Sequence, residues 1–81
     1  MKRKTLVGVD GNAFCIMGTV SGWMEEAYDL AKQRSDEEGM KSFNEEAVNA
    51  YTSDAMSSDY NHLLGVSVKM TDKINRYCCR R

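Results

Sequence analysis

Apolar residues recur every three or four positions along most of this chain, which is the pattern of amphipathic helices. The first stripe follows position 12 and consists of Phe14, Met17, Val20 or Ser21, Met24, Ala27 or Tyr28, and Ala31. The second consists of Met40, Phe43, Ala47, and Ala50 or Tyr51. The third consists of Tyr60, Leu63, Leu64, Ser67, Met70 or Thr71, and Ile74. These stripes predict three helices, over about 12–33, 36–56 and 58–75.

The segment before the first helix has a different pattern. Residues 4–9 read KTLVGV and carry the β-branched residues that favour strands. One strand needs a partner in the same chain or in a second subunit. The region 66–78 offers an alternative partner, because Gly65 and the β-branched Val66 and Val68 weaken its helical pattern.

We therefore predict a mainly α domain of the α+β class, over residues 1–81. It has one N-terminal strand, three helices and possibly a short C-terminal strand. A chain of 81 residues buries a small core, so we also expect a homodimer that supplies further burial.

Two local features of the first helix have alternative interpretations. Asp10, Gly11 and Asn12 form a turn whose side chains suit helix capping, and a helix start also suits an anion. The turn lacks the lysine of a phosphate-binding G-x-x-x-x-G-K-[ST] loop. Further along, Gly18 and Gly22 lie four residues apart and form a notch, against which we expect another backbone to pack.

Charge divides the chain into three parts. Residues 1–4 carry +3 and residues 69–81 carry +4, whereas residues 5–68 carry −8. Basic ends on an acidic chain suit a nucleic-acid surface, provided that the two ends meet in space. The predicted contacts are Lys2, Arg3, Lys4, Lys69, Lys73, Arg76, Arg80 and Arg81, with Tyr77 as an aromatic ring on which a base stacks.

Residues suited to catalysis or metal binding are few. Asp59 and His62 are spaced to share a helix face, but no nucleophile lies in a recognised motif beside them. The three cysteines, Cys15, Cys78 and Cys79, make neither a disulfide framework nor the spacing of a zinc site. We predict no enzyme, no metal and no cofactor. The chain has no apolar run long enough for a membrane span, and we expect it in the cytoplasm.

Two blocks of the sequence resemble a known family. VGVDGNAFCIMGTVSGWMEEA, followed later by DAMSSDYNHLL, is similar to a family of small uncharacterised proteins of tailed bacteriophages and of bacterial genomes with phage-derived genes. Members show a strand, a D-G-N-A-F-x-I-M-G-like corner with a helix, and an S-G-D-Y-D-H-L-L-like segment. This chain departs from them at Ser58, at Asn61 and in its basic residues 69–81. The resemblance implies a phage origin and an accessory role in the host cytoplasm.

These observations favour a non-catalytic accessory protein for host takeover or counter-defence. The first hypothesis is that its basic ends bind RNA, such as a host RNA or the RNA of a toxin–antitoxin system. The alternative is an adaptor or inhibitor that binds a host protein through the acidic helical surface. A sponge for a small ligand and an enzyme are further alternatives, and no residue pattern singles out either.

Overall fold

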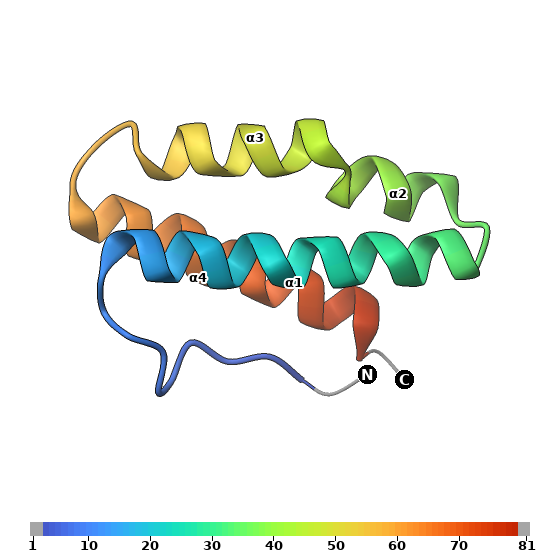
Figure 1. Cartoon of the computed structure of the whole chain (residues 1–81), viewed down its shortest axis with the longest axis horizontal. Helices are drawn as coiled ribbons and strands as arrows, with labels where there is room; N and C mark the ends of the chain where they lie inside the picture. The colour runs from blue at the N-terminus through green and yellow to red at the C-terminus, as the bar shows by residue number, and fades with distance from the viewer. Residues whose placement is uncertain (1–2, 80–81) are drawn as a thin grey trace.

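The computed structural model describes residues 3–79, in which four helices are found (Figure 1). They are α1 (Ala13–Gln33), α2 (Glu37–Phe43), α3 (Glu45–Ala55) and α4 (Tyr60–Cys78). Helices α1 and α4 run in the same direction and pack against each other, whereas α2 and α3 together run back along them. Within residues 3–79 no helix combines the length and the apolar character needed to cross a bilayer.

Each helix begins at an asparagine or aspartate. The side chains of Asn12, Asp36, Asn44 and Asp59 accept hydrogen bonds from backbone N–H groups of the first turns of α1, α2, α3 and α4. These caps satisfy donors that have no partner inside the helix. Asn44 also explains why the predicted helix 36–56 is two helices: its backbone is extended, and its side chain accepts from the Ala47 N–H at 2.8 Å.

The predicted N-terminal strand is wrong, because the structure describes no β-strand anywhere in residues 3–79. Residues 4–6 lie irregularly along α4. The Lys4 N–H donates to Asn75 Oδ1 at 2.7 Å, and Asn75 Nδ2 donates to the Lys4 carbonyl at 2.8 Å. The carboxamide of one side chain therefore supplies the donor and acceptor that a neighbouring strand would supply. The α+β assignment is thus corrected to an all-helical arrangement.

The alternative C-terminal strand is also wrong, since residues 66–78 lie within α4. The buried face of α4 includes the polar residues Ser67, Thr71 and Asn75. Tyr51 Oη and Ser67 Oγ are 2.6 Å apart, and Thr71 Oγ1 donates to the Ser67 carbonyl at 2.8 Å. Burial of this face, with its hydroxyls paired, outweighs the weak strand preference of the neighbouring valines.

The core lies between the four helices. It consists of Ile16, Met17, Val20, Met24 and Ala27 of α1, Phe43 of α2, Tyr51 and Ala55 of α3, and Leu63, Ile74 and Cys78 of α4. Phe14, which the first stripe included, is instead 73% exposed. The expected packing against Gly18 and Gly22 is absent from the described structure, since a Cβ added at either glycine meets no atom within 4 Å.

Replacing Asn75 with alanine tests the pairing with Lys4. We expect Asn75→Ala to lower the free energy of unfolding by about 1–3 kcal/mol, because two backbone groups lose their partners. In urea titrations, Asn61→Ala is the matched control, since Asn61 is exposed on the same helix. Hydrogen exchange at the Lys4 amide should accelerate in Asn75→Ala alone. Equal losses in the two variants would contradict this role.

Gly39 allows α2 to approach α4 closely. A Cβ at this position would lie 2.6 Å from Tyr77 Oη and 2.8 Å from Tyr77 Cζ. We expect Gly39→Ala to lower the free energy of unfolding by about 1–3 kcal/mol through this overlap. Gly18→Ala, which meets open space, should raise it by up to about 1 kcal/mol. Thermal and urea unfolding of both variants show whether the free energy of unfolding changes in opposite directions.

Candidate nucleic-acid interface

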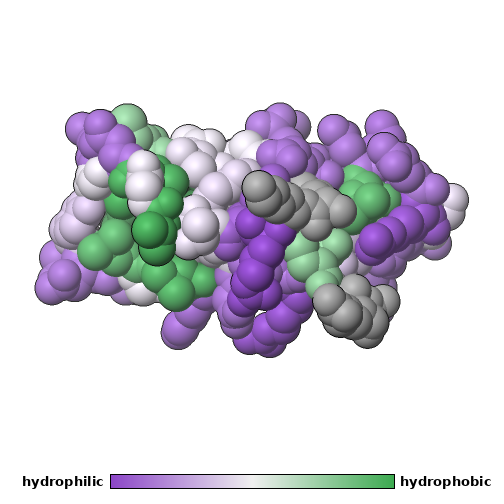
Figure 2. Space-filling model, turned by 90° about the horizontal axis from the view of Figure 1, so that it is seen from below, coloured by the Kyte–Doolittle hydropathy of each residue, from purple (hydrophilic) through white to green (hydrophobic). Residues whose placement is uncertain are grey.

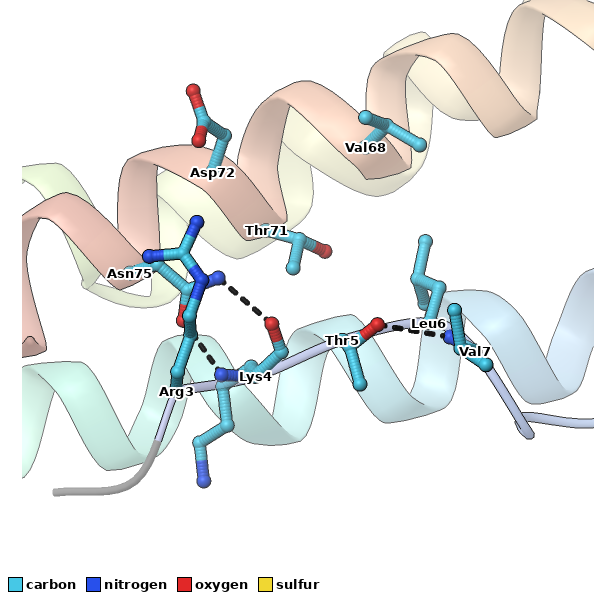
Figure 3. A pocket seen from close by; sticks show the side chains of 9 residues that line it. All are labelled: Arg3, Lys4, Thr5, Leu6, Val7, Val68, Thr71, Asp72 and Asn75. Carbon is cyan, nitrogen blue, oxygen red and sulfur yellow. Dashed lines mark hydrogen bonds between the residues drawn. The ribbon is translucent and has the colours of Figure 1, made fainter.

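The two basic segments of the sequence meet in the structure. The pairing of Lys4 with Asn75 places the start of the described chain along the last turns of α4. Arg3 and Lys4 line one cleft of about 430 Å³ together with Thr71, Asp72 and Asn75 of α4 (Figure 3). The charge pattern required the two basic ends of the chain to meet in space, and Arg3 and Lys4 meet this requirement. Lys2, Arg80 and Arg81 lie outside the described residues.

Two of the predicted contacts are already in ion pairs. Lys4 Nζ lies 3.1 Å from Glu26 Oε1, and the Lys4 side chain is only 16% exposed. Arg76 Nη2 lies 2.5 Å from Asp72 Oδ2, one turn earlier on α4. An anion that binds either cation must compete with a carboxylate, so these two residues contribute less positive potential than their number implies.

Lys69 and Lys73 differ from these residues. Both are exposed on α4, and no carboxylate of the described part of the chain lies within ion-pair distance of either. Lys73 Nζ lies 5.8 Å from the centre of the Phe43 ring of α2. This contact is compatible with a phosphate on the outer side of the ammonium group, because a ring face does not neutralise the charge.

Tyr77 joins α4 to α2. Its hydroxyl donates to Asp36 Oδ2 at 2.7 Å, and its ring packs against Phe43 at 5.5 Å between centres. The Arg34 guanidinium lies 5.3 Å from the centre of the same ring. The Tyr77 ring is thus held between other side chains. The planar Arg34 guanidinium lies beside this ring, on its outer side.

The sequence reasoning missed three basic residues of this region. Lys32 lies in the last turn of α1, Arg34 directly follows α1, and Lys41 lies in the last turn of α2. Cations near a helix C-terminus are favoured by the helix dipole. Because α1 and α4 are parallel, both C-terminal ends lie at the same end of the molecule (Figure 1).

One signal in the sequence could have revealed this grouping. No lysine or arginine occurs in residues 5–31 or 42–68. Every described lysine and arginine therefore lies in one of three short stretches, which the contacts of Lys4 with Asn75, of Arg34 with Tyr77 and of Lys73 with Phe43 bring together. We name this group the basic end; it comprises Arg3, Lys4, Lys32, Arg34, Lys41, Lys69, Lys73 and Arg76.

The Asp10-Gly11-Asn12 corner lies at the opposite end of α1, roughly 30 Å away along a helix of 21 residues. Asn12 Oδ1 accepts from the Phe14 N–H at 2.9 Å and from the Cys15 N–H at 3.4 Å. Asp10 Oδ1 accepts from the Asn12 N–H, and the Gly11 carbonyl accepts from the Tyr60 hydroxyl. These groups cap the helix and fix the turn, while the basic residues lie elsewhere.

His62 lies near this corner, in a different arrangement from a catalytic relay. Its Nε2 atom lies 3.1 Å from Asp54 Oδ1, 3.0 Å from the Asp54 carbonyl and 3.4 Å from Ser57 Oγ. In a nucleophilic triad, the carboxylate and the hydroxyl contact different ring nitrogens. Here they share one nitrogen. Asp59, the expected orienting partner, instead caps α4 by accepting from the His62 N–H.

No disulfide joins the cysteines of residues 3–79. Cys15 is exposed, Cys78 is buried and Cys79 is half-buried. Burial raises the pKa of the Cys78 thiol. No group of three or more His, Cys, Asp or Glu side chains within residues 3–79 has the geometry of a metal site.

Comparisons with known proteins identify no relative, since no family model, no curated protein and no solved structure matches this chain. The geometry of the basic end and the chemistry of its residues are therefore the basis for inference about function.

Two tyrosines of this fold, Tyr51 and Tyr77, make its free energy of unfolding depend on pH in the alkaline range. Burial raises the pKa of Tyr77 above its usual value of 10.0, and its hydrogen bond to the Asp36 carboxylate raises it further. Burial also raises the pKa of Tyr51. A raised pKa in the folded state stabilises the fold below pH 10, and this contribution is lost as pH rises through the folded pKa.

We therefore expect the free energy of unfolding to fall as pH rises above about 10. Tyr77→Phe should make this fall shallower and should remove one late-titrating phenol from the ultraviolet titration. Urea unfolding at successive pH values provides the measurement. An unchanged pH profile in Tyr77→Phe would contradict the assignment.

Proposed function

We propose that this chain binds RNA, or another nucleic acid, through its basic end, and acts by binding without catalysis. The observation that carries the proposal is that the three stretches holding every described lysine and arginine contact one another, in a chain whose net charge is −1. Such a group of cations attracts a polyanion to the surface that carries it.

The contacts available suit a single-stranded or looped nucleic acid. Arg3, Lys69 and Lys73 are exposed cations, and no carboxylate of residues 3–79 lies within ion-pair distance of them. The Arg34 guanidinium, supported by the Tyr77 ring, offers a plane on which an unpaired base stacks. Phosphate contacts together with a stacking plane are the usual means by which proteins hold single strands.

The biological setting is proposed from the family resemblance. A phage-type accessory protein that acts in the host cytoplasm would meet host RNA or the RNA of a toxin–antitoxin defence. A homodimer would double the basic surface. The unpaired strand no longer supports dimerisation, because Asn75 supplies the partners of Lys4.

Fluorescence anisotropy with a labelled single-stranded RNA of about 16 nucleotides tests the proposal. We expect affinity to fall steeply between about 50 and 200 mM salt, because bound phosphates release counterions. The triple variant Arg3→Ala/Lys69→Ala/Lys73→Ala should weaken binding at least tenfold. It should also reduce the slope of log K against log salt by about 2, from ~0.7 per lost contact.

The control variant removes negative charges instead of positive ones. Glu25→Gln/Glu46→Gln/Asp54→Asn changes three exposed carboxylates outside the basic end, so RNA affinity should stay equal or increase. Equal affinity of the parent and the basic-end variant, or binding that does not depend on salt, would overturn the proposal.

A further inference from the structure

Five large apolar side chains of residues 3–79 are exposed, with exposed fractions from 45% to 85%: Val7, Phe14, Met56, Tyr60 and Val68. Val7 and Val68 line the cleft that contains Arg3 and Lys4, whereas Phe14, Met56 and Tyr60 lie in a separate groove; we name these three residues the apolar end. Figure 2 shows apolar residues gathered over one half of the face beneath the helices, with hydrophilic residues over most of the other half. Single exposed apolar residues are ordinary, but grouped ones mark interaction surfaces.

Three of these residues belong to one groove. Phe14 at the start of α1, Met56 after α3 and Tyr60 at the start of α4 line a groove of about 260 Å³. Met17, Ala55 and Leu63, which are core residues, form its floor. The groove therefore has an apolar floor and exposed apolar edges, contributed by three helices or their ends.

The charges around this groove have one sign. Asp59 lines the groove, Asp54 lies in the last turn of α3, and Asp10 precedes α1. No lysine or arginine occurs in residues 5–31 or 42–68, which provide all of the groove. An occupant that complements this surface combines apolar side chains with basic ones.

We propose that the groove of the apolar end docks a segment of another protein, namely an amphipathic helix with an apolar face flanked by lysine or arginine. The apolar face covers Phe14, Met56 and Tyr60, as in other helix-in-groove complexes. The flanking cations lie near Asp54 and Asp59. The site is separate from the basic end and does not depend on the proposed RNA binding.

A second copy of this chain fits the groove less well. Two apolar ends placed face to face bring their aspartates together, which is unfavourable. The basic end of a second copy supplies cations, but the large exposed apolar side chains beside it are only Val7 and Val68, from two separate segments, which is less than the continuous apolar face of an amphipathic helix. The charge pattern thus favours a different protein over self-association.

Three synthetic helical peptides of about 18 residues test the proposal, each with a fluorescent label. The first has leucine on one face and lysine on the other. The second replaces lysine with glutamate, and the third scrambles the first so that the leucines no longer share a face. We expect the first peptide to bind at least tenfold more tightly than the other two, as measured by anisotropy.

Two variants locate the site. Phe14→Ser/Met56→Ser should weaken binding of the leucine–lysine peptide about tenfold or more, whereas Val68→Ser, on an exposed position outside the groove, should leave it unchanged. All three positions are exposed, so the fold is retained, which circular dichroism verifies. RNA binding by Phe14→Ser/Met56→Ser should equal that of the parent chain.

Three results would overturn the proposal. Equal binding of the scrambled peptide would mean attraction by charge alone. Equal weakening by Val68→Ser would place the contact outside the groove. A dimer in light scattering that Phe14→Ser/Met56→Ser dissociates would make a second copy the occupant.

Discussion

The position of the N-terminal segment depends on one side chain, the carboxamide of Asn75. Extended backbone at the surface of a helical protein leaves N–H and carbonyl groups for which a helix has no spare partners. Asn75 offers one donor and one acceptor in a single plane, and Lys4 uses both. The same contact places Arg3 beside the end of α4, and so it joins the two basic segments of the chain. The grouping of the basic residues follows from this pairing and from the parallel course of α1 and α4.

The helices could be predicted from the sequence because their signals are local. Asn12 and Asp59 precede apolar stripes in a way that favours capping, and the structure places a cap at each. The break at Asn44 was harder to predict, since the apolar stripe continues through it and only the cap geometry separates α2 from α3. Phe14 has the spacing of a core residue but lies in the first turn, beyond the edge of the core.

The strand could not be excluded from the sequence alone. Residues 4–9 have strand composition, and what decides their structure is a partner 71 positions away. A buried asparagine in a helical stripe gives no sign of which backbone it binds. The basic end was partly predictable from Arg3, Lys4 and the cations of α4. Lys32, Arg34 and Lys41 were assigned to the acidic middle of the chain, because their location becomes apparent only when the ends of α1 and α2 are placed in space.

The two ends of the molecule have different surface chemistry. The basic end presents cations, several of them held by Glu26, Asp72 or an aromatic ring. The apolar end presents exposed side chains among carboxylates, of which Asp59 already caps α4. A protein with two such ends is suited to hold two different partners at once, because neither partner covers the surface that the other needs.

The separation of 71 positions between Lys4 and Asn75 also has a kinetic consequence. Bringing such distant residues together costs chain entropy that no local contact repays in advance. The helices form from neighbouring residues, and α4 has to be in place before Asn75 is positioned to receive Lys4. Attachment of the N-terminal segment is therefore expected to be among the last steps of folding, and its release to be among the first steps of unfolding.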